Sequence, residues 1–340
     1  MPDFKRLASL SLAVLTASGA AAQDSVEKFY AGRTLRMIVP YPPPSSFDTY
    51  ARAVMRHLPR YIPGNPSIVV QTVPGAGGLN AVQTMANVAA RDGSALATMN
   101  SSNVTDPLIN PETSKFDPRK FNWIGSVNAE GSACAFWSDK VKTLDDLRGR
   151  EIVIGGTGPA AGSTVESRAL QSILGFNFRI VHGYPAQADV RFAAAKGEID
   201  GHCALLVSTL KTDLWDGYKA GKIKVVIQAG VEPHPDIPEV PNAFDLAKKP
   251  EDIAVLKLVF GPWAFGRPVY LPPDVPKDRV DALRLAFDRT MADPEFINDL
   301  KRLNLEHRPI SGARAAALVE EIFRTPPEVI ARVRAMTAGP

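Results

Sequence analysis

The residues best suited to hold a ligand lie in loops that follow a predicted strand and precede a predicted helix. The first loop, residues 41–48, contains Tyr41, Pro43, Ser45, Ser46 and Asp48. A helix that begins near Ser46 exposes unpaired N–H groups and about half a positive charge. We therefore expect this loop to hold an anion without any lysine or arginine. The alternative is an ordinary helix start, with Ser46 as the N-cap and Asp48 in the first turn.

The second loop is rich in glycine and follows the next predicted strand. Gly75, Ala76, Gly77 and Gly78 stand between that strand and a helix that starts near Leu79. Glycine lets the backbone turn sharply or approach a ligand closely. A tight turn would explain the same residues. However, two such loops end consecutive strands of one sheet, where open α/β sheets bind their ligands, so together they favour a binding site.

The third loop matches a dinucleotide-binding pattern only in part. Residues 156–161 read GTGPAA after a predicted strand, as in the pattern G-x-G-x-x-G/A. The acidic residue expected about 20 positions later is missing, which argues against nicotinamide binding. Gly156, Thr157, Ser163 and Thr164 could instead form a second anion-facing loop from another lobe. The alternative is a glycine turn with a serine cap.

Patterns typical of catalysis or metal binding do not stand out in the sequence. There is no evident Ser/His/Asp set, carboxylate pair or G-x-S-x-G elbow, so an enzymatic function has little support. The five histidines are scattered without metal-ligand spacing, and no cofactor is expected. Cys134 and Cys203 could form a disulfide in an oxidising compartment, or they could be two small buried apolar residues.

The elements that must position these loops form an α/β pattern. Short β-rich runs alternate with amphipathic stretches from residue 35 onward, which predicts mostly parallel sheets flanked by helices. The predicted strands are 35–40, 68–73, 95–99, 123–127, 133–137, 151–154, 178–181, 199–205 and 224–228. Residues 232–241, EPHPDIPEVP, cannot form a regular helix or a central strand and are expected to cross between lobes. The chain after them is predicted to be mainly helical.

Length and composition indicate a globular protein of two domains. The chain has 340 residues, which is too long for one small core. Apolar residues make up 45% and charged residues 22% of the chain. The net charge of +3 is too small to indicate a polyanionic partner, so nucleic acid binding is not expected.

The N-terminal segment has the features of an export signal. Lys5 and Arg6 precede an apolar run over residues 7–15, and small residues lead to Ala22. The run is shorter than the roughly 20 residues that a membrane span needs. We expect residues 1–22 to be a signal peptide cleaved near Ala22, and the mature protein to be periplasmic and soluble. No run of 18 apolar residues follows, so the mature chain would need membrane partners to move a solute across a bilayer.

Several motifs together resemble one protein family. The segments YPPPSSFDTYAR, YIPGNPSIVVQTVPGAGGLNA, FNWIGSVN, VIGGTG and GEIDGHCA occur in this order between residues 30 and 311. They resemble the substrate-binding proteins of tripartite tricarboxylate transporters, the Bug family. The resemblance implies a two-lobed periplasmic-binding-protein-like fold of type II, with a ligand in the cleft between the lobes and no catalysis. It assigns residues 30–129 and 244–340 to lobe one and residues 130–243 to lobe two.

The resemblance also implies where a carboxylate ligand is held. Residues 41–48 and 75–78 would grip one carboxylate with backbone groups and ordered water. The residues that would close over it from lobe two are Gly156, Thr157, Ser163, Thr164, Tyr184 and Asp200. The chain departs from the family where Pro44, Ser45 and Ser46 replace glycines. One N–H donor is lost and two hydroxyls are gained, so the family name does not identify the ligand.

A binding protein of this family delivers its ligand to an ion-gradient-driven carrier made of a large and a small membrane subunit. We therefore expect a monomer whose lobes close around a small organic carboxylate and whose closed form the membrane partner recognises. The sequence leaves two alternatives open. One is a ligand-sensing partner of a sensor kinase, and the other is an exported enzyme with a nucleotide or acyl-transfer site.

Overall fold

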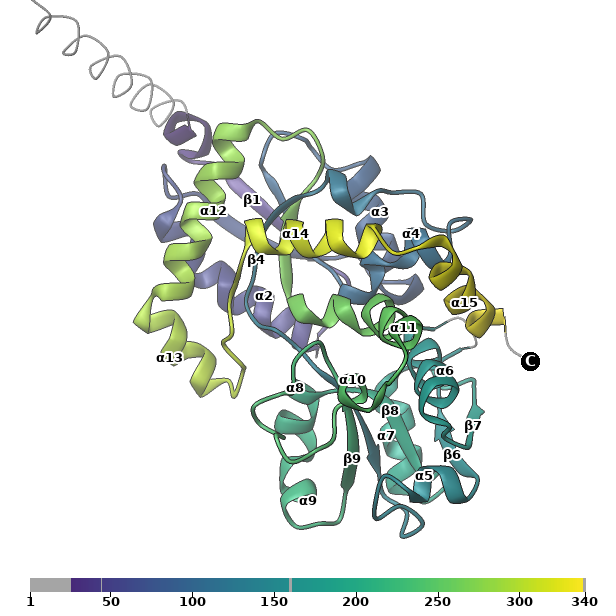
Figure 1. The fold of residues 1–340 in the computed structure, drawn as a ribbon. Coiled ribbons are helices and arrows are strands. Elements are labelled where there is room, and N and C mark those ends of the chain that lie inside the picture. The colour runs from purple at the N-terminus through teal and green to yellow at the C-terminus, as the bar shows by residue number, and fades with distance from the viewer. Residues whose placement is uncertain (1–25, 44, 159–160, 339–340) are drawn as a thin grey trace, which may run out of the picture.

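The structure is a computed structural model that describes residues 26–43, 45–158 and 161–338. The predicted signal peptide, residues 1–22, and Pro44 lie outside the described residues. Two β-sheets lie one above the other in Figure 1, each flanked by helices. The two-lobed α/β fold predicted from the sequence pattern is thereby confirmed.

The first sheet contains six strands in the order β11-β4-β10-β3-β1-β2. They are β1 (Thr34–Val39), β2 (Ser67–Thr72), β3 (Ala95–Thr98), β4 (Asn122–Ser126), β10 (Pro268–Leu271) and β11 (Ile310–Ser311). β1 pairs in parallel with β2 and β3, whereas β10 runs antiparallel to both β3 and β4. β1, β2, β3 and β4 therefore point the same way, and their carboxyl ends share one edge of the sheet.

The second sheet contains five strands in the order β7-β6-β8-β5-β9. They are β5 (Ser132–Phe136), β6 (Ile152–Gly155), β7 (Phe178–Val181), β8 (Gly201–Leu206) and β9 (Lys224–Ala229). β6 pairs in parallel with β7 and β8, and β5 runs antiparallel to β8 and β9. The reversed strands β5 and β10 are those by which the chain enters each sheet from the other one.

Helices cover both sheets. The α-helices are α2 (Ser46–His57), α3 (Leu79–Asn87), α4 (Asp106–Ile109), α5 (Asp146–Gly149), α6 (Gly162–Leu174), α7 (Gln187–Ala195), α8 (Val207–Thr209), α9 (Trp215–Lys219), α10 (Ala243–Leu246), α11 (Pro250–Phe260), α12 (Lys277–Ala292), α13 (Pro294–Arg302), α14 (Gly312–Phe323) and α15 (Pro327–Ala338). Shorter helical segments are η1 (Leu58–Tyr61), η2 (Ala76–Gly78), η3 (Ser101–Val104), η4 (Pro118–Lys120), η5 (Leu210–Leu214) and η6 (Gly261–Phe265). Among the described helices, none combines the length and the apolarity needed to span a bilayer.

The strand pattern explains how the first sheet is covered. Successive side chains of a strand point to opposite faces. Leu35, Met37 and Val39 of β1 accordingly belong to the core cluster that includes α2 and α12, whereas Ile38 belongs to the cluster that includes α3. Helices therefore bury both faces of this sheet, as its continuous apolar strands require.

All nine predicted strands are present, with ends that differ by at most two residues. The predicted helical character of the C-terminal part is also found, but β10 and β11 were missed. Proline opens β10 at Pro268 and follows it at Pro272, which conceals a four-residue strand from a pattern search. β11 contains only two residues and depends on pairing with β4.

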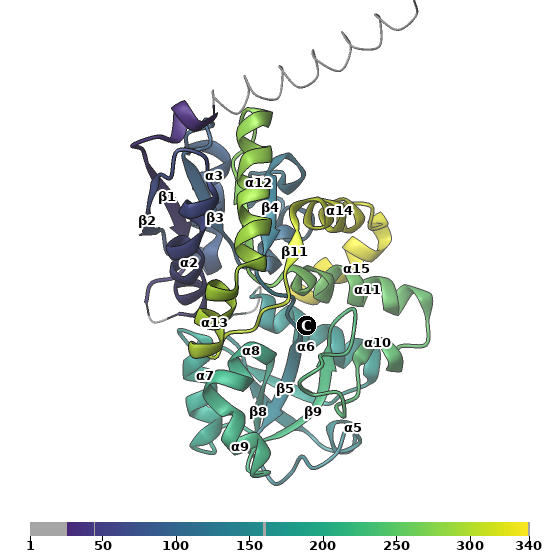
Figure 2. The ribbon, with the colours of Figure 1, turned by 90° about the vertical axis from the view of Figure 1, so that its left-hand side faces the viewer.

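One hydrophobic core cluster runs through both lobes. It includes Ala95 of β3, Ile154 of β6 and Leu170 of α6, together with Leu256 of α11 and Val333 of α15. α11 and α15 pack against α6 from the side of the first sheet, as Figures 1 and 2 show. The boundaries at residues 129/130 and 243/244 remain predictions, because apolar packing is continuous along this side.

Candidate functional site

The turns that follow the parallel strands of both sheets meet where the lobes face each other. A β-carbon at Gly162, the first residue of α6, would lie 3.6 Å from Ser102 Oγ in η3, which follows β3. Ser208, just after β8, donates its backbone N–H to Glu130 Oε2 at 3.4 Å. Glu130 belongs to the segment that crosses from β4 to β5. The fold therefore gathers loops from both sheets into one region.

In the first loop, the N-cap of α2 is one residue earlier than the alternative assignment of Ser46 as the N-cap would place it. Ser45 is the N-cap, because its Oγ accepts the Asp48 backbone N–H at 3.2 Å. Asp48 Oδ2 accepts from Arg52 Nε at 2.8 Å, and Asp48 Oδ1 is buried without a hydrogen-bond partner among the described residues, so its contact with a ligand stays a prediction. Pro43 is exposed. These contacts correct the N-cap assignment and leave Ser46 free for another role.

The second loop is fixed against the first by Tyr41. Its Oη donates to the Gly77 carbonyl at 2.9 Å and accepts from Asn100 Nδ2 at 3.2 Å. All four loop residues have positive φ: Gly75 118°, Ala76 48°, Gly77 64° and Gly78 95°. A β-carbon at Gly77 would have no other atom within 4 Å, so this turn faces open space. The structure therefore brings the two predicted loops together.

A buried arginine stands directly behind the first loop. Arg267 lies between η6 and β10, and only 1% of its surface is exposed. Its Nη2 donates to Ser46 Oγ at 2.9 Å, and its Nη1 donates to the Gly266 carbonyl at 3.1 Å. Glu130 Oε1 lies 3.5 Å from Arg267 Nη1 and supplies the opposite charge. The loop was expected to hold an anion without any lysine or arginine, and the structure adds a buried arginine that contacts its residue Ser46.

Two hydroxyl residues of the third loop differ in their hydrogen bonding. Thr164 Oγ1 donates to the Gly158 carbonyl at 2.7 Å, and a β-carbon at Gly156 would lie 2.9 Å from that same Oγ1. The Thr164 hydroxyl proton is thus used within the loop, and its contact with a ligand stays a prediction. Ser163 is 6% exposed, and its Oγ has no hydrogen-bond partner among the described residues. Ser163 and the partly exposed Thr157 remain as predicted contacts.

Tyr184 and Asp200 differ in their relation to the third loop. The Tyr184 ring lies beside Gly155 at the end of β6, where a β-carbon would be 3.1 Å from it. Asp200 lies level with Val153, because its N–H donates to the Val153 carbonyl at 2.7 Å. Burial raises the pKa of Asp200, but hydrogen bonds from Val153, Lys140 and Ser138 bring it below its ordinary value. The Asp200 carboxylate thus accepts hydrogen bonds from Val153 and Lys140, and its contact with a ligand stays a prediction.

Comparisons with known proteins identify the fold. No protein-family profile matches the chain. A UPF0065 protein from Pseudomonas sp. is 21% identical over 332 residues, which cover 95% of this chain and 90% of that protein. A TctC solute binding protein from Polaromonas matches with a TM-score of 0.67 at 17% identity, covering 90% of this chain and 98% of its own. The chain has the fold of the periplasmic solute-binding proteins.

Two further structures share this solute-binding-protein fold. MatC from Rhodopseudomonas palustris, with bound malate, matches with a TM-score of 0.65 at 18% identity and covers 90% of this chain and 99% of its own. The periplasmic binding protein BugD matches with a TM-score of 0.65 at 20% identity and covers 90% of this chain and 98% of its own. The resemblance to Bug proteins seen in the motifs is thus confirmed at the level of the fold.

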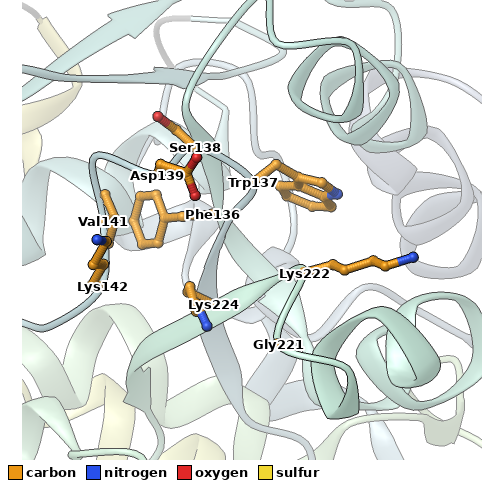
Figure 3. Close-up of a pocket in the computed structure, with 9 residues that line it drawn as sticks. All are labelled: Phe136, Trp137, Ser138, Asp139, Val141, Lys142, Gly221, Lys222 and Lys224. Carbon is orange, nitrogen blue, oxygen red and sulfur yellow. The ribbon is translucent and has the colours of Figure 1, made fainter.

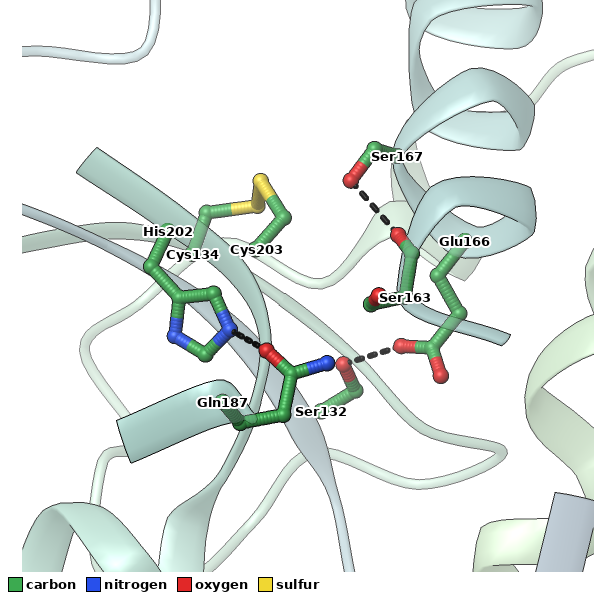
Figure 4. The surroundings of a disulfide bond; sticks show 8 residues. All are labelled: Ser132, Cys134, Ser163, Glu166, Ser167, Gln187, His202 and Cys203. Carbon is green, nitrogen blue, oxygen red and sulfur yellow. Dashed lines mark hydrogen bonds between the residues drawn. A yellow bond between two sulfur atoms is a disulfide. The ribbon is translucent and has the colours of Figure 1, made fainter. Parts of the chain in front are cut away.

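The second lobe of this solute-binding-protein fold contains a disulfide. Cys134 on β5 and Cys203 on β8 are bonded, with their Cα atoms 4.0 Å apart (Figure 4). Both residues are fully buried beneath α6. The bond joins the strand that enters this lobe to the strand that leads to α8, so it ties together two segments next to the candidate site.

A buried carboxylate lies near the disulfide in Figure 4. Glu166 of α6 accepts from Ser132 Oγ at 2.6 Å and from Trp263 Nε1 at 3.1 Å. Burial raises the pKa of Glu166 to about 7, and the two donors oppose this rise. Ser132 begins β5 and Trp263 belongs to η6. The carboxylate therefore connects α6 to both routes by which the chain passes between lobes.

A hollow of about 300 Å³ lies elsewhere on the second lobe. Its lining includes Phe136, Lys142, Lys222 and Lys224, drawn in Figure 3. Phe136 is the last residue of β5. Ser132 is the first residue of this strand, and it is the one that lies near the loops. None of the predicted ligand-binding residues lines this hollow, so it is separate from the site that the loops form.

Two groups of histidine and carboxylate side chains occur within the described ranges: His57 with Asp293 and Glu295, and His234 with Asp236 and Glu306. Basic side chains already pair with these carboxylates. Arg60 contacts both acids of the first group, and Lys211 and Arg308 contact those of the second. Both groups are therefore explained as ion pairs.

Sequence reasoning missed the buried charges Arg267, Glu130 and Glu166. A signal existed for Arg267, which is the only charged residue between Lys257 and Asp274. An isolated charge in an apolar run predicts a buried, partnered side chain. Glu130 carries the same signal, because it is the only charged residue between Lys120 and Asp139, whereas Glu166 stands only two positions from Arg168.

Proposed function

We propose that this chain is an extracytoplasmic solute-binding protein that captures a small organic carboxylate between its lobes. In this proposal it delivers the carboxylate to a tripartite tricarboxylate-type carrier with a large and a small membrane subunit. Two contacts support the proposal: Tyr41 joins the first two loops at Gly77, and Gly162, next to Ser163 in the second lobe, lies close to Ser102, which follows β3 in the first. The export signal expected in residues 1–22 supports a periplasmic location. The malate bound to MatC supports a carboxylate as the ligand class.

The loops supply donors for an anion from both lobes. Ser46 and the turn at Gly77 belong to the first lobe, and Ser163 in the first turn of α6 belongs to the second. Hydrogen bonds to a charged group contribute roughly 1.5 to 3 kcal/mol each. Four or five of them total on the order of 10 kcal/mol before the costs of association, and micromolar binding requires about 8 kcal/mol.

Closure of the lobes follows from this division of donors. Each lobe holds only part of the shell, so the ligand makes all its contacts only when the lobes are together. A ligand stabilises the conformation that it binds more tightly. The closed, loaded form is then the form that a membrane partner can distinguish from the empty one.

A thermal-shift screen of carboxylic acids tests this function. The panel contains acetate, succinate, malate, adipate, citrate and benzoate, with the matching neutral amides as controls. A ligand at about 1,000 times its Kd stabilises the folded protein by about 4 kcal/mol. We expect at least one acid to raise the melting temperature and its neutral amide to leave it unchanged. No shift with any acid, or chemical conversion of a bound acid, would contradict the proposal.

A further inference from the structure

The contact between Arg267 and Ser46 determines where the Ser46 hydroxyl can donate. A hydroxyl has one proton and two acceptor lone pairs, whereas a guanidinium has only donors. Arg267 Nη2 donates to Ser46 Oγ at 2.9 Å, so it occupies a lone pair. The proton of Ser46 remains to be donated, and within the described part of the chain no residue accepts it.

The two side chains lie at different depths. Arg267 is almost completely buried, whereas Ser46 is only partly buried. Ser46 is also the first residue of the 12-residue helix α2, whose first amides have no partner within the helix. The guanidinium therefore stands behind the hydroxyl, and the hydroxyl and helix amides face the space in front of the loop.

The charge behind Ser46 faces one carboxylate, that of Glu130, and the rings of Phe47 and Tyr50, whose centroids lie 4.3 and 5.5 Å from the guanidinium carbon. Glu130 Oε1 lies 3.5 Å from Arg267 Nη1 and also accepts from Asn128 Nδ2 at 3.1 Å. Arg267 Nε has no partner in the structure as described, although the side chain is buried. A guanidinium next to the positive end of a helix is unfavourable unless negative charge is also present. Glu130 supplies one such charge, and an anion in front of Ser46 would supply another.

We propose that Arg267 is a positioning residue that directs the Ser46 hydroxyl toward the ligand and makes this hydroxyl a charge-assisted donor for an ionised carboxylate. The inference rests on the proposed function. In it, the Ser46 hydroxyl, directed by Arg267, is the group that favours an acid over its neutral amide. Hydrogen bonds polarised by an ionised group are about twice as strong as neutral ones. It also gives a purpose to the serine at position 46, where the related family has glycine.

The test measures affinity for malate and succinate by calorimetry, together with the melting temperature of each ligand-free variant. The variants are Arg267→Met, Ser46→Ala, the double variant of both, and Glu130→Gln. Arg119→Met is the matched control, because Arg119 is exposed, pairs with nearby Asp117 and lies over the Phe323 ring, and none of these residues is among the predicted ligand contacts. We expect Arg267→Met and Ser46→Ala each to weaken acid binding about tenfold or more, and the control to leave it unchanged.

The double variant distinguishes positioning from a structural role. If Arg267 acts through Ser46, Arg267→Met has little further effect on affinity once Ser46 is alanine, so the two losses are not additive. Glu130→Gln keeps the acceptor oxygen and removes the competing charge, so it should tighten acid binding several-fold. If Arg267→Met does not fold, the affinity of Glu130→Gln still tests whether the charge of Arg267 strengthens acid binding.

Three outcomes would overturn the inference. They are additive losses in the double variant, unchanged affinity in a folded Arg267→Met protein, and weaker binding in Glu130→Gln. In each of these cases the wild-type protein binds an acid, so the proposed function survives. If the wild-type protein binds no acid in the screen, the proposed function fails and the inference fails with it.

Discussion

Single residues between the lobes have roles that follow from their surroundings. Gly77 adopts a φ of 64° and faces open space, so its lack of a side chain matters both for backbone conformation and for access. Glu166 is a buried carboxylate that two neutral donors hold without a cation. Changes at these two positions should therefore affect different properties, the first ligand binding and the second the pH dependence of stability.

Valine at position 77 should block the ligand. Gly77→Val places a branched side chain in the open space before the turn and strains a backbone that favours glycine. We expect acid binding to weaken more than tenfold in calorimetry. Gly197→Val is the matched control, because Gly197 also has a positive φ, 79°, and open space around its β-carbon position. Equal affinity loss in both variants, or none in either, would count against the assigned turn.

Glu166 should make stability fall as the pH rises. Its pKa is raised from 4.5 to about 7 in the folded protein, so the folded state holds the proton more tightly than the unfolded state. This contribution is fully present below about pH 4.5 and is lost as the pH rises through about 7. The loss is on the order of 3 kcal/mol, at about 1.4 kcal/mol per pKa unit.

Urea unfolding at pH 5 and pH 8 measures this effect against a matched variant. Glu166→Gln keeps the size and one acceptor, and its amide can donate to Ser132. The wild-type protein should lose more unfolding free energy between the two pH values than the variant does. Identical losses in the two proteins would show that Glu166 does not titrate in this range.

Secondary-structure elements were the most predictable part of the molecule. Strands such as β1 and β6 are short apolar runs between turn residues, and their pattern depends only on local sequence. β10 was hidden by its flanking prolines, and β11 exists only through its pairing with β4. Local pattern therefore specifies strands that form an extended apolar run, and it fails for strands that tertiary pairing creates.

The site was predictable only as far as its loops. The loops containing Ser46, Gly77 and Ser163 follow strands, so strand order alone brings the first two together. The partner of Ser46 is Arg267, which is 221 residues away, and no local pattern joins them. For the same reason the hydrogen bond that the Asp200 carboxylate accepts from Val153, 47 residues away, could be found only from the structure.

The disulfide should stabilise the second sheet as an element. Cys134 and Cys203 are 69 residues apart and join β5 to β8. Closing a loop of this length restricts the unfolded chain, and native disulfides typically contribute about 2 to 4 kcal/mol. We expect the Cys134→Ala, Cys203→Ala double variant to lose that amount of unfolding free energy and to bind acids normally. An oxidised wild-type protein no more stable than this variant would contradict the prediction.

At the scale of the whole molecule, the two lobes repeat one plan and face each other through equivalent edges. In each sheet four strands run one way, and β10 or β5, where the chain arrives from the other lobe, runs the opposite way; the first sheet has β11 as a second reversed strand. α11 and α15 join the lobes through a continuous apolar core against α6 (Figure 2). Rotation of the lobes about this core, with closure around a ligand, is the motion that we predict.

A crystal structure of the protein with the acid that binds most tightly in the screen tests the central claim most directly. The account predicts one carboxylate at hydrogen-bonding distance, about 3 Å, from the Ser46 hydroxyl and beside the turn at Gly77, with the rest of the acid toward Ser163. An acid bound instead among Lys142, Lys222 and Lys224, or chemically altered, would contradict it.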